Sequence, residues 1–456
     1  AENGCNVKLV SSLPSERAQS VMAEGGINAA LNTKDENDSP EEHFTDTIKA
    51  ACGLADPNAV WGMTQAAPEL VHWLLKLGVK FNMSGYDDVD LRNFGGQKKK
   101  RTAFAQSDTG KQIMTAMIDA VRRKEASGMV ERFSHHSFLT LRLCGNICCG
   151  CVIRDEYSQE TVELPGDAVI VATGGMHGLF GNTTGSLSNT GEVTAELFRL
   201  GVPLANGEMI QYHPTTVKCG GKRMLISEAA RGEGGRLFAM KDGKQWYFME
   251  EKYPELGNLM PRDITAREIW KVSHESEVFL DMTEISEEII SNKLSGLADD
   301  CMTYLHKDIR KEPVSVLPGI HYFMGGILVD EQHRTPIQNL YAAGECCAQY
   351  HGANRLGGNS LLGALYGGRV AAKSACEQAD VVDLSCATQI DFPPASQISE
   401  IKQLNKVMQE TMGVVRNENT LLNGIQTVQA LTGNLPLLGM AVLKSALARK
   451  ESRGAH

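Results

Sequence analysis

At 456 residues the chain is longer than one hydrophobic core usually serves, so two or three domains are expected. Hydrophobic residues make up 42% of it and charged residues 22%, which is typical of a globular protein. The net charge is −10 and the longest basic run covers only residues 98–101, so nucleic acid is not an expected partner. The sequence contains no run of about 18 apolar residues, so no membrane-spanning helix is expected.

The first residues are typical of the end of one element and the start of another. Residues 1–4 resemble the last turn of a helix capped by Gly4, and residues 7–10 predict a short strand. In a dinucleotide-binding fold, such a strand follows a strand, a Gly-rich turn and a helix, which together hold the pyrophosphate. This first βα unit is expected upstream of residue 1. The chain also stops abruptly after a helical run, so we interpret it as an internal fragment.

The next elements alternate between helices and strands. Apolar residues three and four apart predict helices over residues 40–52 and 57–77. The apolar run 168–172 enters Thr173-Gly174-Gly175 and predicts a buried parallel strand, and residues 340–345 repeat this pattern. In α/β sheets, cofactors bind where such strands end. After the proline pair at 393–394 the sequence is mostly helical.

Four of the twelve cysteines gather in one segment, at positions 144, 148, 149 and 151. Residues 138–154 alternate between apolar and polar and predict two strands around Gly145-Asn146. Structural metal sites usually combine two distant cysteine pairs, which this sequence lacks, so no metal site is expected. We interpret all twelve cysteines as free thiols, which suits a reducing cytoplasm.

Candidate binding residues lie in short Gly-rich segments, each of which alone is typical of an ordinary turn or a surface ion pair. Glycines in AEGGINAA (23–30) and FGGQ (94–97) would let the backbone approach a ligand closely. Two histidines, two arginines and a Glu–Arg pair suit a ligand with two negative charges, because arginine donates bidentate hydrogen bonds to carboxylates. These residues are His213 in QYHPT, Glu228 and Arg231 in SEAARGEGG, Arg262 in MPRD, His321 in HYFMGG and Arg355 in HGANRLGGNSLLG.

The order of these motifs resembles the flavoprotein subunit of the succinate dehydrogenase and fumarate reductase family. The resemblance runs from Val7 to His456 and also includes ATGG, LYAAGE and RKESRGAH. It implies an α/β fold in which a Rossmann-like FAD-binding domain is interrupted by an α+β capping domain and followed by a C-terminal helical domain. The implied boundaries are 1–206 and 323–385 for the FAD-binding domain, 207–322 for the capping domain and 393–456 for the truncated helical domain.

The resemblance implies that FAD-dependent reduction of fumarate to succinate, or the reverse, takes place here. Flavin N5 would deliver hydride to one alkene carbon, and Arg262 would protonate the other, resupplied through Glu228 and Arg231. Arginine is an unusual acid because the guanidinium pKa exceeds about 12, but the developing carbanion is strongly basic. Asp263 is expected to orient Arg262. The implied substrate-binding residues are His213, Ser227 (where the family usually has threonine), His321, Arg355, Phe94, Gly95 and Gln97.

The resemblance also implies a set of residues that line the FAD. Gln19 stands where membrane-linked members carry the histidine that is bonded covalently to FAD, so noncovalent FAD is expected. The family's covalent bond raises the flavin potential, and its absence favours fumarate reduction over succinate oxidation. An iron–sulfur partner subunit remains expected, with the chain cytoplasmic or peripheral at the inner face of the membrane. The predicted FAD-binding residues are Ser11, Ala23, Gly25, Gly26, Thr173, Gly174, Glu192, Glu345, Asn359, Ser360 and Leu361.

Three alternative functions remain open. L-Aspartate oxidase shares the HPT and RGEGG motifs and the second arginine, and it binds FAD noncovalently, although FGGQ and MGG favour the dicarboxylate reductases. A reductase of another enoate would use the same chemistry, but His213, His321 and Arg355 together favour two carboxylates. A non-catalytic electron-transfer flavoprotein would have no use for a proton relay such as Arg262, Glu228 and Arg231.

Overall fold

The computed structural model describes residues 1–456 except 86, 380–389 and 395. The strands predicted at residues 7–10, 168–172 and 340–345 are present, and each takes part in a parallel pair. β1 (Val7–Ser11) pairs with β5 (Val130–Ser134), and β9 (Val169–Val171) pairs with β19 (Leu340–Ala342). Only part of β9 is buried, contrary to prediction: Ile170 is 41% exposed, because its face of the strand is not covered. Within the described residues, β1 and β9 each pair along one edge only.

The remaining strands form small sheets, most of them antiparallel. β6 and β7 confirm the two strands predicted around residues 145–146. The strands of these sheets, in spatial order, are β2 (Ile27–Asn28), β4 (Thr102–Ala103) and β3 (Leu91–Arg92); β6 (His136–Cys144), β7 (Ile147–Asp155) and β8 (Thr161–Pro165); and β10 (Leu204–Ala205), β18 (Gly326–Leu328) and β20 (Cys347–Ala348).

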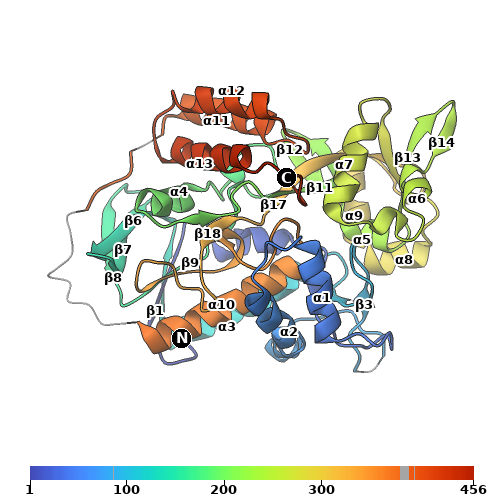
Figure 1. The fold of residues 1–456 in the computed structure, drawn as a ribbon. Coiled ribbons are helices and arrows are strands. Elements are labelled where there is room, and N and C mark those ends of the chain that lie inside the picture. The colour runs from blue at the N-terminus through green and yellow to red at the C-terminus, as the bar shows by residue number, and fades with distance from the viewer. Residues whose placement is uncertain (86, 380–389, 395) are drawn as a thin grey trace.

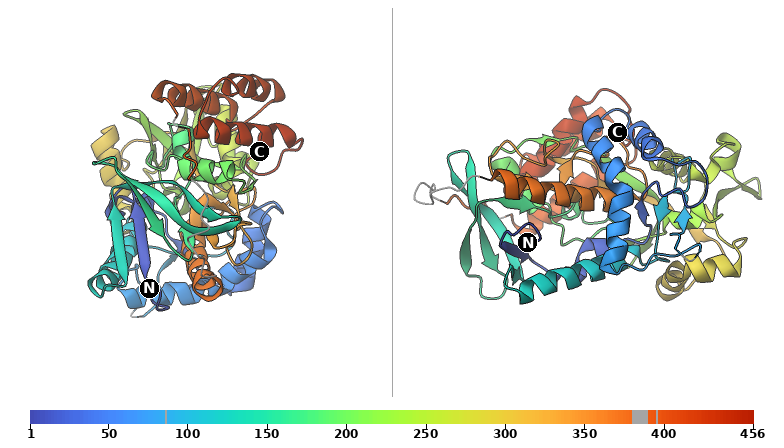
Figure 2. Two further views of the ribbon diagram at one scale, coloured as in Figure 1. Left: turned by 90° about the vertical axis from the view of Figure 1, so that its left-hand side faces the viewer. Right: turned by 90° about the horizontal axis from the view of Figure 1, so that it is seen from below.

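Two long helices pack against the parallel strands: α10 (Asn359–Gln378) contacts β9 and β19, and α3 (Thr109–Ala126) contacts β5. α2 (Pro57–Leu77) and α1 (Pro40–Ala50) confirm the helices predicted at these positions, and each begins with a proline behind a capping side chain. Ser39 accepts a hydrogen bond from Glu42 N at 3.2 Å, and Asp56 accepts one from Asn58 N at 2.9 Å. Seen from below, α2 crosses the ends of α10 and α3, as Figure 2 shows.

The segment between β11 (Ile210–Cys219) and β17 (Leu317–Phe323) forms a group at one end of the molecule (Figure 1). β11 and β17 are antiparallel neighbours, so the chain leaves and returns at one place. The group has a hydrophobic core of its own that includes Leu237, Ile269 and Leu280. Its elements are β12 (Lys222–Leu225), α5 (Glu228–Gly232), β13 (Arg236–Lys241), β14 (Lys244–Trp246), α6 (Phe248–Lys252), α7 (Arg262–Val272), β15 (Val278–Asp281), α8 (Glu287–Lys293), α9 (Ser295–Asp300) and β16 (Val314–Ser315).

The C-terminal helices α11 (Ile398–Thr411), α12 (Glu418–Val428) and α13 (Asn434–Ala448) confirm the helical region predicted from residue 397. They lie together on one side of the molecule (Figure 1), and α13 packs on α4 (Glu192–Arg199). The last residues return to the middle of the chain, where Ala455 N donates to Ala353 O at 2.9 Å. The domain boundaries at 206, 322 and 393 stay predictions, and the boundary at 385 lies outside the described residues.

Two expectations about local structure are wrong. Residues 1–4 form a single turn, in which Gly4 N donates to Ala1 O at 3.1 Å, and not the end of a helix. Cys144 is disulfide-bonded and not a free thiol. The spacing of the nearby cysteines could not predict this bond, because the fold decides which cysteines meet. Cys148 and Cys149 are buried free thiols on β7, as expected. Cys386 lies outside the described residues.

Arg101 forms a buried ion cluster that should contribute to the stability of this fold. Its guanidinium donates to Asp38 at 2.8 Å and lies 2.8 Å from Asp46, and all three side chains are nearly inaccessible to water. Replacing Arg101 with methionine leaves two buried carboxylates unpaired, so we expect a loss of about 3–5 kcal/mol in the free energy of unfolding.

Urea unfolding followed by circular dichroism would measure this loss. Arg122→Met, which removes an exposed pair with Glu16, is the control and should cost less than about 1 kcal/mol. Equal small losses in both variants would contradict the prediction.

Candidate active site

Glu228 bridges two arginines in the interior of the molecule. Its Oε2 accepts from Arg262 Nε at 2.9 Å and from Arg262 Nη2 at 2.6 Å, and its Oε1 accepts from Arg231 Nη2 at 3.1 Å. All three side chains are buried. Burial would raise the pKa of Glu228, but the charges of Arg262 and Arg231 outweigh it and lower that pKa below its ordinary value. The structure thus joins the three residues predicted as a proton relay.

Short helices place these groups. Ser227 is the N-cap of α5 and accepts from Ala229 N at 3.4 Å, so Glu228 and Arg231 occupy the first and last turns of one five-residue helix. Arg262 is the first residue of α7, directly after Pro261. Because Glu228 and Arg231 are three residues apart on a helix, their side chains lie on one face.

Arg355 is a second buried arginine, and few groups compensate its charge. Its guanidinium lies over the Tyr322 ring, 4.1 Å from the ring centroid, and Nη1 makes one long hydrogen bond, of 3.4 Å, to Leu356 O. Its Nε is buried without a hydrogen-bond partner within the described part of the chain. Burial lowers the pKa of Arg355 to about 9, and the nearby charge of Arg262 acts in the same direction. A buried cation in this state favours a bound anion.

His213 and His321 lie together beside these arginines. Their ring centroids are 5.1 Å apart, and His321 Nδ1 is bonded to Thr184 Oγ1 at 2.7 Å. Burial lowers the pKa of both imidazoles well below the ordinary value, and the charge of Arg262 lowers both further. Both histidines are therefore neutral at pH 7. The Nδ1 of His213 lies 3.1 Å from Thr215 O, so each ring uses its Nδ1 within the protein.

The charges of this cluster do not balance. Arg231, Arg262 and Arg355 supply three positive charges, Glu228 supplies one negative charge, and the two histidines are neutral. An excess of two positive charges is left in a buried region, which suits a ligand with two carboxylates.

The segment predicted to bind substrate through Phe94, Gly95 and Gln97 lies against this cluster and contacts protein groups there. Gly95 N donates to Glu228 Oε1 at 3.2 Å, and Gln97 Nε2 donates to Gly357 O at 3.0 Å. A Cβ at Gly95 would lie 2.7 Å from Glu228 Oε1, so only glycine fits there. Whether these residues also touch substrate stays a prediction.

Asp263 does not orient Arg262, and that expectation is wrong. The Asp263 carboxylate is paired with Arg267 at 3.2 Å, one helical turn further along α7. Adjacent residues of a helix point in different directions, so Asp263 faces away from the group that Arg262 contacts.

Several of the predicted FAD residues lie just after β9 and β19 and at the start of α10. Thr173 and Glu192 are exposed, and Gly174 has a positive φ of 71° in the turn after β9. A Cβ at Gly174 would lie 2.6 Å from Asn189 Nδ2, and one at Gly358 would lie 2.1 Å from Asn28 Oδ1. Both positions therefore require glycine, because an asparagine side chain packs against the backbone there. α10 begins at the second of these turns, and a helix N-terminus suits the phosphates of a dinucleotide.

The other predicted FAD residues fall into two groups. Ser11, Ala23, Gly25, Glu345 and Ser360 are partly accessible, whereas Gly26, Asn359 and Leu361 are buried. The Asn359 side chain is fully occupied by protein groups: its Oδ1 accepts from Asn28 Nδ2 at 2.7 Å and contacts His43 Nε2 at 2.9 Å, and its Nδ2 donates to Thr47. Gln19 Oε1 accepts from Ser186 N at 2.5 Å.

Sequence reasoning missed three polar residues of the site, of which Gln211 and Asn28 are buried and Glu24 is partly accessible. Gln211 contacts Arg262, Asn28 contacts Gly357 and Asn359, and burial raises the pKa of Glu24 to about 8, helped by the charge of Asp300. Each lies inside a motif that the sequence singled out for a neighbouring residue. The sequence did hold a signal for Gln211 and Asn28, because each is a polar residue of a strand, between apolar residues. A polar residue that is buried in this way is expected to be hydrogen-bonded.

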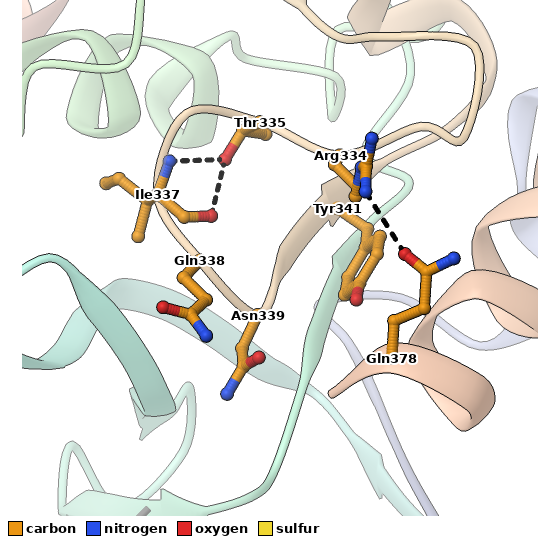
Figure 3. A pocket seen from close by; sticks show the side chains of 7 residues that line it. All are labelled: Arg334, Thr335, Ile337, Gln338, Asn339, Tyr341 and Gln378. Carbon is orange, nitrogen blue, oxygen red and sulfur yellow. Dashed lines mark hydrogen bonds between the residues drawn. The ribbon is translucent and has the colours of Figure 1, made fainter. Parts of the chain in front are cut away.

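A pocket of about 180 Å³ lies away from this site (Figure 3). It is lined by Arg334, Tyr341 and Gln378 among others, and Arg334 Nη1 donates to Gln378 Oε1 at 3.3 Å. These residues are at the amino end of β19 and the last turn of α10, opposite to the strand ends where α/β sheets bind cofactors. The pocket is also small for a cofactor, since ligand sites usually measure about 300–1,000 Å³.

Comparison with known proteins decides the family. Residues 1–361 match the family described as FAD binding domain. The chain belongs to this family of FAD-binding flavoproteins. The match covers every residue of the arginine and histidine cluster and every predicted FAD residue.

The similar proteins are oxidoreductases of more than one kind. The chain is 40% identical over 447 residues to the succinate dehydrogenase flavoprotein subunit of Bacillus subtilis, covering 96% of this chain and 76% of the relative. It is 34% identical over 448 residues to the L-aspartate oxidase of Caulobacter vibrioides, covering 96% and 84%. The FrdA chain of an E. coli quinol fumarate reductase mutant has the same fold, with a TM-score of 0.89, 26% identity and coverage of 99% and 86%.

These comparisons confirm the predicted fold class and the membership of an FAD-dependent oxidoreductase family that includes succinate dehydrogenase and fumarate reductase flavoproteins. Several relatives are named as subunits, so flavoproteins of this family also occur in larger complexes. In the described part of the chain, no helix is both long and apolar enough to cross a membrane.

The neutral state of the two histidines can be measured directly. Because the folded protein keeps both imidazoles neutral while an unfolded chain takes up protons below about pH 6.5, lowering the pH from 7 to 5 should reduce the stability of the fold. Nuclear magnetic resonance of the protein labelled with ¹⁵N-histidine should show neutral rings for His213 and His321 at pH 5.5, assigned with His213→Gln and His321→Gln variants. A charged imidazolium at either position at pH 6 would disprove this.

Proposed function

We propose that this flavoprotein interconverts fumarate and succinate. The observation that carries the proposal is the buried excess of two positive charges formed by Arg231, Arg262 and Arg355 against Glu228, beside two neutral histidines. A C4 dicarboxylate supplies two negative charges, and its carboxylates accept hydrogen bonds from arginine and histidine. Cations without partners are costly in a protein interior, so the site favours a dianion over a neutral or singly charged molecule.

Each residue of the cluster has a proposed role. Arg355, His213, His321 and Ser227 bind and orient the two carboxylates. Arg262 donates the proton to the carbon that becomes negative, and its charge stabilises that carbon during the transfer. FAD, when bound, supplies the hydride for the other carbon. Phe94, Gly95 and Gln97 hold the wall of the site next to Glu228 and Gly357.

Glu228 and Arg231 resupply the proton to Arg262. Glu228 touches both arginines at 2.6–3.1 Å, so a proton can pass between them along hydrogen bonds that already exist. Burial lowers the pKa of Arg231, which makes its guanidinium easier to deprotonate than one in water. Glu228 is anionic, because the two arginines lower its pKa, so it has an unprotonated oxygen that can take up a proton and pass it on.

L-Aspartate oxidase is the second candidate, favoured by the 34% identity to the enzyme from Caulobacter vibrioides. Aspartate carries an ammonium group as well as two carboxylates. The cluster offers this cation one buried carboxylate, Glu228, which both arginines already use. This charge balance favours fumarate over aspartate.

We further propose that FAD is held without a covalent bond, because Gln19 replaces the histidine that attaches it in membrane-linked members. An amide nitrogen or oxygen does not form such a bond, and Gln19 is instead hydrogen-bonded to Ser186 N. Relatives named as flavoprotein subunits support a partner subunit, and we propose an iron–sulfur partner that exchanges electrons with the FAD at the inner face of the membrane.

Arg262→Ala should abolish fumarate reduction. Reduced viologen dye would be the electron donor, without oxygen, and we expect kcat to fall by at least about 10³-fold because the proposed proton donor is lost. Arg310→Ala, which removes an exposed arginine in the same part of the chain, is the control and should keep kcat within about twofold.

If the FAD-loaded wild type does not reduce fumarate, the proposed function is wrong, and turnover of aspartate with oxygen would favour the oxidase. Full activity of Arg262→Ala would instead show that Arg262 is not the proton donor.

Precipitation with acid tests the attachment of FAD. All of the yellow FAD should stay in the supernatant when the purified protein is denatured with trichloroacetic acid, because no covalent bond retains it. The variant Gln19→His provides the comparison, since it restores the side chain that can form the bond. Yellow wild-type pellets would contradict noncovalent binding.

A further inference from the structure

We infer that Gln211 is a positioning residue that holds the proton donor Arg262 and the carboxylate-binding segment at Arg355 in fixed relation to each other. The inference rests on the proposed function and adds a residue to it. Gln211 is 1% exposed, and it lies on β11 two residues before His213. Its amide oxygen accepts from Arg262 Nη1 at 3.0 Å, and its amide nitrogen donates to Arg355 O at 2.8 Å and to Asn354 Oδ1 at 3.1 Å.

The orientation of this amide follows from its partners. A main-chain carbonyl such as Arg355 O can only accept, so the nitrogen of Gln211 must face it. The guanidinium of Arg262 can only donate, so the oxygen must face Arg262. With the amide reversed, its oxygen would face the carbonyl oxygen of Arg355 and its nitrogen would face the guanidinium of Arg262, so neither hydrogen bond could form. Glutamine therefore fits in one orientation only, and all three hydrogen bonds depend on it.

Gln211 gives the Arg262 guanidinium a second anchor. Glu228 holds Nε and Nη2 along one edge of the planar group, and Gln211 holds Nη1 at the other end. One carboxylate alone leaves the group free to pivot about that edge. Two anchors at different ends fix its plane, and thereby the direction of the remaining N–H groups. Misplacing a reacting group by about 1 Å can reduce the rate on the order of 10²-fold.

The second anchor is also neutral, which matters for an arginine that must release a proton. A carboxylate at position 211 would hold Arg262 at least as firmly, but at about 3 Å its charge would stabilise the guanidinium and oppose proton transfer. It would also cancel one of the two excess positive charges that bind the dianion. Gln211 thus positions the Arg262 guanidinium without adding a charge, whereas Glu228 positions it and also neutralises part of the charge of the cluster.

The hydrogen bond to Arg355 O ties this anchor to substrate binding. Arg355 O belongs to the segment that ends in Gly357 and Gly358, and a Cβ at Gly357 would lie 2.9 Å from Arg262 Nη2. The side chain of Gln211 therefore sets the distance between Arg355, which binds a carboxylate, and Arg262, which donates the proton. We expect this spacing to set how well bound substrate is aligned with Arg262, and not how tightly substrate binds.

The test uses the FAD-loaded protein with the variants Gln211→Leu and Gln211→Glu. Gln211→Leu should lower kcat for fumarate by about 10- to 100-fold and leave KM within about threefold, because only alignment is lost. Gln211→Glu should lower kcat and also raise KM, because it adds a negative charge to the site. Calorimetric binding of succinate to the same samples, which needs no turnover, should show a dissociation constant within about threefold of wild type for Leu and clearly weaker binding for Glu.

Gln349→Leu is the matched control, because Gln349 is a buried, hydrogen-bonded glutamine that does not contact the cluster. It should lower the melting temperature as Gln211→Leu does, while kcat stays within about threefold. A merely structural role of Gln211 would give both variants the same kcat. Wild-type kcat in Gln211→Leu, or equal changes in kcat and succinate affinity, would overturn the inference. Inactivity of the wild type would instead overturn the proposed function.

Discussion

The structure of the site depends on one buried carboxylate, Glu228, shared by two arginines. Without Arg262 and Arg231, burial would favour a protonated Glu228, and without Glu228 both guanidinium groups would be buried with no counter-charge. The three charges are therefore stable in the interior only as a set. Because one negative charge faces three positive ones once Arg355 is included, the set remains incomplete until an anion binds.

This constraint accounts for the close packing around the set. Gly95 is a glycine because its N–H must reach Glu228 and no Cβ fits, and Gly357 is a glycine because a Cβ would lie 2.4 Å from Glu228 Oε2. The positions come from distant parts of the chain: a loop near residue 95, two short helices and the turn before α10. The pairing of β11 with β17 brings His213 and His321 to the same place. The site therefore exists only when these distant segments are packed together.

Much of this could be predicted from the sequence. Periodicity and caps located α1 and α2, alternation located β6 and β7, and the motifs named the residues that the fold brings together. The predictions that were wrong depend on neighbours in space. Asp263 follows Arg262 in the sequence but pairs with Arg267. Ile170 is exposed although its segment is entirely apolar. Gln211 and Glu24 lay inside motifs, but their burial and partners come from strands and loops far away in the sequence. The disulfide at Cys144 was likewise invisible to local spacing.

The most direct test of this account is Glu228→Gln, measured for fumarate turnover and for succinate binding. If Glu228 carries protons and balances charge, kcat should fall by at least about 10²-fold while succinate binds as tightly as before or more tightly, because removing a negative charge makes the site more positive. Loss of turnover and binding together would mean that Glu228 merely maintains the structure. Unchanged turnover would contradict the relay.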